Sequence, residues 1–261
     1  MTAHAAFDPK ELEAKVKAMY RDVATKPTGP YHFEMGRALA ERLGYDKALL
    51  DAIPQQSIES FAGVGHYFHL ADIQEGETVV DLGSGSGMDT FIAARKVGRT
   101  GKVFGIDMTD EQRVKAEGLR VRDGYTNVKY LKGYIEQVPL PDGSVDAVIS
   151  NGVINLATDK ARVFREAARL LRVGGRLAIS DIVTDVRLPE TITCNSTLWA
   201  ACIGGAGQRD DYRALIESAG LRVVKEEDNE QYTFLSDNAR AASRKFGVKS
   251  ISILAVKRAA N

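Results

Sequence analysis

The sequence predicts an α/β fold in which a doubly wound, mostly parallel sheet is covered by helices on both faces. Short apolar runs typical of buried strands recur from residue 78 onwards, and stretches of helical length separate them. Strands that alternate with helices require right-handed crossovers, which produce a parallel sheet. The length of 261 residues suffices for one such domain with extra segments at its ends.

The composition is that of an ordinary globular chain, with 44% hydrophobic and 27% charged residues. Lysine plus arginine equals aspartate plus glutamate at 35 each, so no net charge attracts nucleic acid or an anionic membrane. The N-terminus lacks a signal-peptide pattern, and no segment has the roughly 18 apolar residues of a membrane span. Since there are only two cysteines, Cys194 and Cys202, we expect a reducing, cytoplasmic location and no membrane partner.

Residues 1–59 are predicted to form an N-terminal helical cap segment. Pro9 suits the first turn of a helix, and apolar residues recur at helical spacing after it. Residues 25–30, rich in proline and glycine, break this pattern, and a second amphipathic run follows over 32–49. The remaining chain, 60–261, is predicted to form the sheet domain.

Within the sheet domain, predicted strands and helices alternate. Strands are expected at 78–82, 103–106, 128–131, 147–150, 176–179, 221–226 and 250–257. Helices are expected at 88–97, 111–121, 160–171 and 211–219. A tight turn is expected at 173–176 and an irregular stretch before the last strand, which should run antiparallel to the others. Residues 185–209 are the least regular part and are predicted to be a substrate-side insertion, which carries Trp199 and both cysteines.

A glycine-rich loop after the first predicted strand is the main functional feature. It reads acid-x-Gly-x-Gly-x-Gly, through Asp81, Gly83, Ser84, Gly85 and Gly87. Glycines suit a sharp turn that a ligand approaches closely. The dinucleotide fingerprint has a different spacing, and a pyrophosphate prefers helix amides without a carboxylate beside them. A ligand with an α-ammonium group, such as the methionine end of S-adenosylmethionine, favours Asp81, or Asp89 at the helix start.

Polar residues also follow the next three strands. Asp107 lies about 20 residues after the loop, where an acid reaches ribose hydroxyls in this topology. The alternative for Asp107 is a helix N-cap, because a helix is predicted to begin close by. Glu136 follows the third strand, where an adenine edge would be met, and Asn151 ends the fourth. Ligands of open α/β sheets bind at this edge.

These features resemble the class I, Rossmann-like S-adenosylmethionine-dependent methyltransferases. The sequence is similar to the arsenite methyltransferases and, more distantly, to the ubiquinone and menaquinone C-methyltransferases. The likeness extends over residues 60–257, and the segments that carry it best are 77–87, 101–109, 149–156 and 174–182. It implies S-adenosylmethionine as cofactor and a set of cofactor-binding residues, namely Asp81, Gly83, Ser84, Gly85, Gly87, Asp107, Met108, Ile135, Glu136 and Asn151.

The resemblance also implies three arsenic-binding cysteines, of which this sequence retains one. Gly63-Val64-Gly65 stands at the first position and Gly152 at the second, whereas Cys202 is present. Trivalent arsenic requires several converging thiolates. Cys194 is eight positions from Cys202, about 12 Å along a helix axis, so the two reach one atom only if the segment is a loop. The simpler interpretation of both cysteines is that they are small buried apolar residues, and we predict no metal site.

Three histidines before the first strand are candidates for a general base. His66 and His69 lie in the lead-in segment that often forms a lid over the methyl donor in such folds, and His32 lies further upstream. A base is needed only if the acceptor loses a proton on attack. Two histidines on a half-exposed helix are an equally good interpretation.

We therefore predict a methyltransferase that acts on a small molecule, with arsenite methylation as the alternative. A second alternative is a non-catalytic module that binds S-adenosylmethionine. The strand end at 150–153 lacks the Asn/Asp-Pro-Pro-aromatic pattern of enzymes that methylate amino groups of nucleic acids, so no nucleic-acid partner is expected. The oligomeric state is left open.

Overall fold

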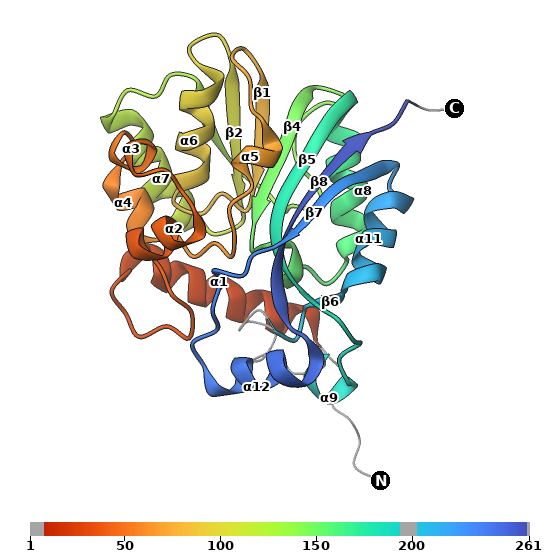
Figure 1. The fold of residues 1–261 in the computed structure, drawn as a ribbon. Coiled ribbons are helices and arrows are strands. Elements are labelled where there is room, and N and C mark those ends of the chain that lie inside the picture. The colour runs from red at the N-terminus through yellow and green to blue at the C-terminus, as the bar shows by residue number, and fades with distance from the viewer. Residues whose placement is uncertain (1–7, 194–202, 260–261) are drawn as a thin grey trace.

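The structure, a computed structural model, describes residues 8–193 and 203–259. Their strands are β1 (Thr78–Leu82), β2 (Lys102–Asp107), β3 (Val128–Lys132), β4 (Val145–Asn151), β5 (Leu171–Thr184), β6 (Gly207–Gln208), β7 (Leu221–Asp228) and β8 (Lys249–Lys257). They form one sheet in the order β3-β2-β1-β4-β5-β8-β7, with β6 beside β5 (Figure 1). β8 is antiparallel to β5 and β7, and the other pairs are parallel. The predicted doubly wound sheet with an antiparallel last strand is confirmed.

The described helices lie before and between these strands. The N-terminal segment contains α1 (Pro9–Thr25), α2 (Arg37–Leu43), α3 (Lys47–Asp51), α4 (Gln55–Glu59) and α5 (Phe68–Ala71). The sheet connections contain α6 (Met88–Val97), α7 (Asp110–Arg122), η1 (Ile154–Leu156), α8 (Lys160–Leu170), α9 (Glu190–Thr193), α11 (Arg209–Ser218) and α12 (Asp237–Phe246). Each of these helices is too short or too polar to span a membrane.

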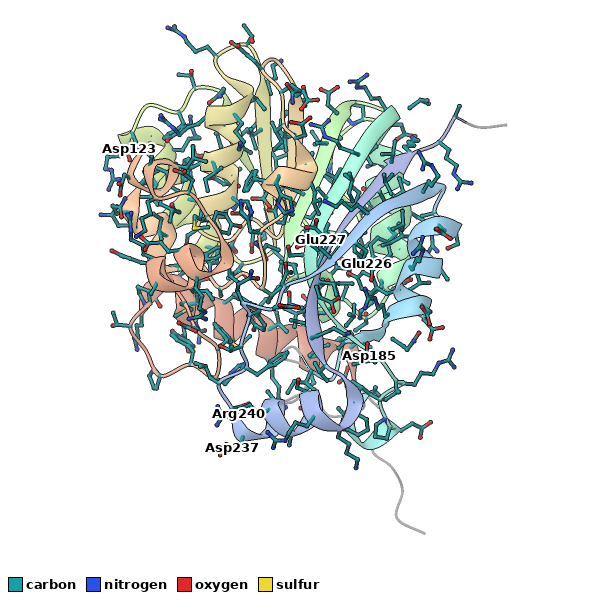
Figure 2. The ribbon with its side chains drawn as sticks, viewed as in Figure 1. Asp123, Asp185, Glu226, Glu227, Asp237 and Arg240 are labelled. Atoms are coloured by element: carbon teal, nitrogen blue, oxygen red, sulfur yellow. The ribbon has the colours of Figure 1, made fainter. Side chains whose placement is uncertain are left out.

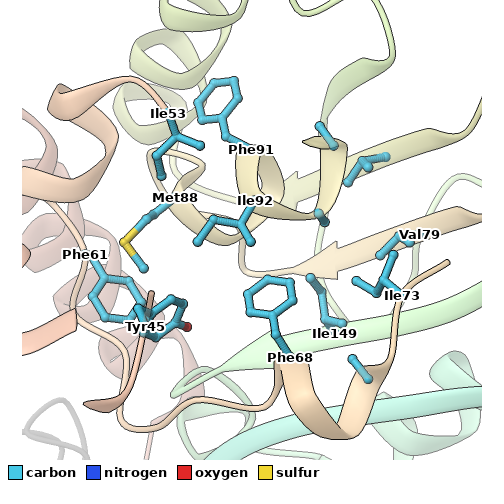
Figure 3. Close-up of a cluster of buried hydrophobic side chains, with 14 of the residues drawn as sticks. Tyr45, Ile53, Phe61, Phe68, Ile73, Val79, Met88, Phe91, Ile92 and Ile149 are labelled. Carbon is cyan, nitrogen blue, oxygen red and sulfur yellow. The ribbon is translucent and has the colours of Figure 1, made fainter. Parts of the chain in front are cut away.

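Two apolar cores cover the two faces of the sheet because neighbouring residues of a strand point in opposite directions. Val79 faces α6 and packs in one core with Phe91. Figure 3 shows this core, which aromatic side chains from the N-terminal segment complete. Val80, the next residue of β1, packs in the other core with Phe164 of α8. The strand pattern therefore buries β1 on both sides, as expected for a central parallel strand.

The N-terminal segment departs from the prediction in its helix boundaries. The predicted run over 32–49 forms two short helices, because Gly44 ends α2 in the left-handed conformation with φ 102°. Gly36, with φ 85°, precedes α2, so the preceding residues are not helical. The division at residue 59 stays a prediction, although Ile58 of α4 shares a core with the sheet.

Three further regions were predicted incompletely. Helix α12 lies where an irregular stretch was expected, and Ser236 caps its N-terminus while Gly247 ends it. β5 begins before the predicted turn at 173–176, and its pairing with β4 is irregular there. The predicted insertion at 185–209 contains α9 and β6. Its two cysteines and Trp199 lie outside the described residues.

Candidate functional site

A cavity of about 250 Å³ lies at the carboxyl ends of β1, β2 and β4. The glycine-rich loop after β1 forms one wall, and residues of α1, including Leu12 and Val16, form another. The ten residues predicted to bind the cofactor all line it, namely Asp81, Gly83, Ser84, Gly85, Gly87, Asp107, Met108, Ile135, Glu136 and Asn151. The fold thus brings the whole predicted set together at the sheet edge where ligands of such folds bind.

The three glycines of the loop have positive φ angles of 72° at Gly83, 52° at Gly85 and 93° at Gly87. A Cβ atom at Gly83 would lie 2.5 Å from a methyl of Val153, and one at Gly87 would lie 2.1 Å from the hydroxyl of Tyr130. At Gly85 the closest atom would be 3.7 Å away. Protein packing therefore excludes side chains at Gly83 and Gly87, whereas it leaves room for a Cβ atom at Gly85, which lines the cavity.

Hydrogen bonds hold the loop against β2. The backbone amides of Gly83 and Ser84 donate to the Ile106 carbonyl at 2.8 and 2.9 Å, and Gly85 N donates to Asp107 Oδ2 at 2.9 Å. The other carboxylate oxygen of Asp107 accepts from Thr109 N at 2.8 Å. The N-cap of α7 is Thr109, so Asp107 is not the N-cap residue that the alternative hypothesis predicted. It joins the two loops that border the cavity.

Two buried carboxylates, Asp81 and Asp89, line the methionine end predicted for this cavity. Asp81 accepts one side-chain hydrogen bond, from Thr90 Oγ1 at 2.6 Å. Burial and the charge of Asp89 raise the pKa of Asp81 to about 8. A cationic ligand group would offset both effects, because an opposite charge favours the ionised carboxylate. The acid pair therefore fits an ammonium or sulfonium group.

The Asn151 side chain, although it lines the cavity, is fully engaged with the protein. Its Oδ1 accepts from Val64 N at 2.8 Å and Gly65 N at 3.3 Å. Its Nδ2 donates to the hydroxyl of Tyr45 and the Gly65 carbonyl, each at 3.0 Å, and to Asp89 at 3.2 Å. An amide has two donor hydrogens and one acceptor oxygen. Asn151 thus fastens the lead-in segment to the end of β4.

The opposite end of the cavity suits a partly polar, flat group. Met108, Ile135 and Glu136 line it, and burial raises the pKa of Glu136. Ser84 is also buried, and its Oγ has no hydrogen-bond partner within the part of the chain that the structure describes. Such an unsatisfied hydroxyl beside a cavity is available to a bound polar ligand.

Helix α1 is tied to the glycine-rich loop through Gln112, a residue that the sequence analysis did not single out. Gln112 Nε2 donates to the carbonyl of Tyr20 at 3.0 Å, and its Oε1 accepts from Ser86 Oγ at 2.5 Å. Gln112 is 2% exposed. No local sequence signal identifies a buried glutamine of this kind, because its partners are 92 and 26 residues away.

None of the three candidate histidines lines the cavity. His69 pairs with Glu227 of β7, labelled in Figure 2, with Nε2 and Oε2 2.7 Å apart. His66 stacks on His69 and meets the edge of Tyr45, and burial lowers its pKa to about 4. His32 lies edge-on to its neighbour Phe33. A general-base role for these residues stays a prediction that their placement does not support.

The two positions where the resemblance implies cysteines lie next to each other in space. A Cβ atom at Gly152, whose φ is 70°, would be 3.1 Å from a methyl of Val64. Val64 is 2% exposed and packs with apolar residues of α1 and η1, including Leu12 and Leu156. The space is therefore closed by apolar packing and contains no thiol from either position.

Comparisons with known proteins identify the family. A family model described as a methyltransferase domain matches residues 73–220. The arsenite methyltransferase of Halobacterium salinarum is 36% identical over 245 residues, 88% of this chain but only 62% of that protein. The ubiquinone/menaquinone biosynthesis C-methyltransferase UbiE of Salmonella paratyphi B is 33% identical over 162 residues, covering 60% of this chain and 63% of that protein.

A solved structure agrees with the sequence comparisons. The arsenic(III) S-adenosylmethionine methyltransferase of Chlamydomonas reinhardtii superposes with a TM-score of 0.68 at 32% identity, covering 87% of this chain and 75% of that one. Together with the matched domain model, this likeness confirms the resemblance drawn from the sequence. The chain spans 40–62% of the length of the arsenite methyltransferases from Halobacterium salinarum and human that it matches. It belongs to the methyltransferase-domain family and is similar to the arsenite methyltransferases within it.

Proposed function

We propose that the cavity binds S-adenosylmethionine and that the protein methylates a small organic acceptor. In this proposal Asp107 binds the ribose hydroxyls, Asp81 the α-ammonium group, and Ile135 and Glu136 the adenine, and the support is that all four residues line the cavity. The bound cosubstrate supplies an activated methyl group on a sulfonium. The chain's own contribution is to orient both reactants and to exclude water under α1, and such positioning provides much of the acceleration of a bimolecular transfer.

The observation that supports an organic acceptor is the packing of Val64 against Gly152. These residues stand where the resemblance implies two thiolates, and the apolar contact between them leaves neither a soft ligand nor room for one. Val64 does not line the cavity itself, but Leu12, Val16 and Leu156 belong to the same apolar cluster and do line it. An apolar wall favours an acceptor with hydrocarbon surface, since removing such surface from water is favourable.

Arsenite is the second candidate because the relatives that match this chain include arsenite methyltransferases. Cys202, the retained cysteine, and Cys194 lie outside the described residues. Within the described residues, no group of three or more His, Cys, Asp or Glu side chains is arranged to hold a metal ion. A cytoplasmic location and the lack of a nucleic-acid partner stay expectations.

Assays with arsenite and with organic acceptors distinguish the two proposed functions. We expect the purified protein with glutathione, S-adenosylmethionine and arsenite to give little or no methylated arsenic by mass spectrometry, because one thiolate is insufficient. A panel of organic thiols, amines, phenols and carbon acids should release S-adenosylhomocysteine with at least one member. Cys202→Ser, the matched variant, should retain that activity.

Two other outcomes would decide against this proposal. Efficient methylation of arsenite that Cys202→Ser abolishes would show that other ligands complete an arsenic site. Tight binding of S-adenosylmethionine without turnover of arsenite or of any organic acceptor would favour the non-catalytic module.

A further inference from the structure

Two tyrosine hydroxyls behind the cavity converge on one carboxylate. Tyr45, between α2 and α3, donates to Asp89 at 2.8 Å, and Tyr67, before α5, donates to it at 2.7 Å. Both tyrosines are buried, with exposures of 4% and 0%, and neither lines the cavity. Asp89 does line it, from the first turn of α6.

We propose that Tyr45 and Tyr67 are positioning residues that hold the Asp89 carboxylate beside Asp81, so that the cavity prefers the cationic methyl donor to its product. This inference rests on the proposed binding of S-adenosylmethionine. The donor carries a sulfonium, whereas S-adenosylhomocysteine carries a neutral thioether, so the two ligands differ by one positive charge at sulfur. A site with two carboxylates responds to this difference more strongly than a site with one.

The hydrogen bonds explain how two buried acids can share the cavity. Asp89 is 5% exposed, and burial alone raises its pKa. The bonds from Tyr67, Tyr45 and Asn151 act in the opposite direction, because donors stabilise the ionised carboxylate. The charge of Asp89 in turn raises the pKa of Asp81, so the two groups interact electrostatically. The tyrosine bonds therefore oppose the rise in the pKa of Asp89 that burial produces, and so favour its ionised form.

Removing the two hydroxyls should weaken this charge without changing the shape of the cavity. Of the side-chain hydrogen bonds that described residues donate to Asp89, the longer one from Asn151, at 3.2 Å, would remain. The pKa of Asp89 would rise, so its carboxyl group would be protonated more often and would attract the positive charge of the ligand less. The affinity for S-adenosylmethionine should then fall more than the affinity for S-adenosylhomocysteine.

The test compares both ligands by calorimetry at pH 7.5 in the wild type and in the Tyr45→Phe/Tyr67→Phe double variant. The double variant should lower the ratio of the affinity for S-adenosylmethionine to that for S-adenosylhomocysteine by about tenfold, the effect expected when hydrogen bonds to a charged group are removed. Tyr212→Phe is the matched control. It also removes a buried hydroxyl that donates to a carboxylate, Asp181 at 2.6 Å, but it lies away from the cavity, so the preference should stay unchanged.

Asp89→Asn provides an independent check if the double variant does not fold. It keeps the size of the side chain and removes the charge, so it should reduce the preference to the same degree. An unchanged preference in a folded double variant, or in Asp89→Asn, would overturn the inference while leaving the proposed function intact. A wild type that binds neither ligand would overturn the proposed function, and the inference with it.

Discussion

At the residue scale, the three glycines of the glycine-rich loop are required for different reasons. Gly83 makes room for Val153 and Gly87 for the hydroxyl of Tyr130, so both are required by the folded protein itself. A Cβ atom at Gly85 would meet only ordinary contact distances, and this residue lines the cavity. The sequence pattern alone does not distinguish these roles, because all three residues are glycines with positive φ.

This difference predicts separate effects of substitution. Gly85→Ala should weaken binding of S-adenosylmethionine by about 1–3 kcal/mol, because the added methyl group occupies ligand space. Its effect on the free energy of unfolding should match that of Gly124→Ala. Gly124 also has positive φ, and an added Cβ there has no neighbour within 4 Å, while at Gly85 the nearest atom, Gln112 Oε1, is at the ordinary contact distance of 3.7 Å. Both variants therefore carry mainly the backbone strain of about 1–2 kcal/mol.

Calorimetry measures the affinity for S-adenosylmethionine, and urea unfolding measures the free energy of unfolding. Gly83→Ala should instead lower the free energy of unfolding by more than either variant, because its Cβ would overlap Val153. Equal ligand affinity in Gly85→Ala and Gly124→Ala would mean that Gly85 does not face the ligand.

At the element scale, α1 is attached to the sheet domain by a few buried contacts near the cavity. Leu12 and Val16 are 2% and 3% exposed, and both pack beside Val64. Lys17, with Glu13, also contacts the Tyr134 hydroxyl. A helix held mainly by one apolar face opens more easily than the central strands, because fewer contacts must break.

Leu12→Ala should therefore speed amide hydrogen exchange in α1 and leave exchange in β1 and α6 unchanged. Replacing a buried leucine by alanine costs about 2–5 kcal/mol of packing free energy. Here the lost packing is that of α1 against the rest of the protein, so opening of α1 should become easier. S-adenosylhomocysteine should slow exchange in α1 of the wild type. Lys15→Ala, at a half-buried residue of the same helix that does not line the cavity, is the control. Faster exchange throughout the sheet would show that α1 is part of one cooperative unit.

At the scale of the whole molecule, buried acids make the stability of the ligand-free protein depend on pH. The pKa of Asp81 is raised to about 8, so the folded protein binds more protons than the unfolded chain between pH 4 and 8. Stability from this group falls as pH rises through that range. The pKa of Asp181 is raised to about 6, so this group also makes stability fall with rising pH, below pH 6. The pKa of His66 is lowered to about 4, so this group makes stability rise with pH up to pH 6.5. The pKa of Lys160 is lowered to about 8, so this group makes stability rise with pH above pH 8.

Between pH 6.5 and 8, Asp81 therefore lowers the stability as pH rises, and Asp89 and Asp107, whose pKa values burial also raises, act in the same direction. The free energy of unfolding should fall by about 1–2 kcal/mol over this interval, as urea denaturation will show. Asp81→Asn should remove part of the slope, and saturating S-adenosylmethionine should reduce it, because the bound cation replaces the proton. A stability that rises over the same interval would contradict the assignment of a protonated Asp81.

The local sequence was sufficient to predict the central strands and the sheet edge at which the cavity lies. The runs that form β1 and β2 are buried, Asp107 ends β2 and Asp81 is the residue before the end of β1, so period and spacing alone predicted that both acids lie at one edge. Such features depend on neighbours within a few residues. Helix α12 was missed although Ser236 and Gly247 supply ordinary cap signals, because its apolar residues are small and few.

Only the tertiary structure decided which side chains share the site. Asn151 bonds to residues 87 and 106 positions away, and the histidines expected near the reacting atoms instead face β7 and the aromatic core. The placement of β8 between β5 and β7 was likewise not evident from its own pattern. A sequence pattern records which residues are buried and how they repeat. It does not record their partners, because a buried tyrosine or asparagine is satisfied by whichever distant group the fold brings within hydrogen-bond reach.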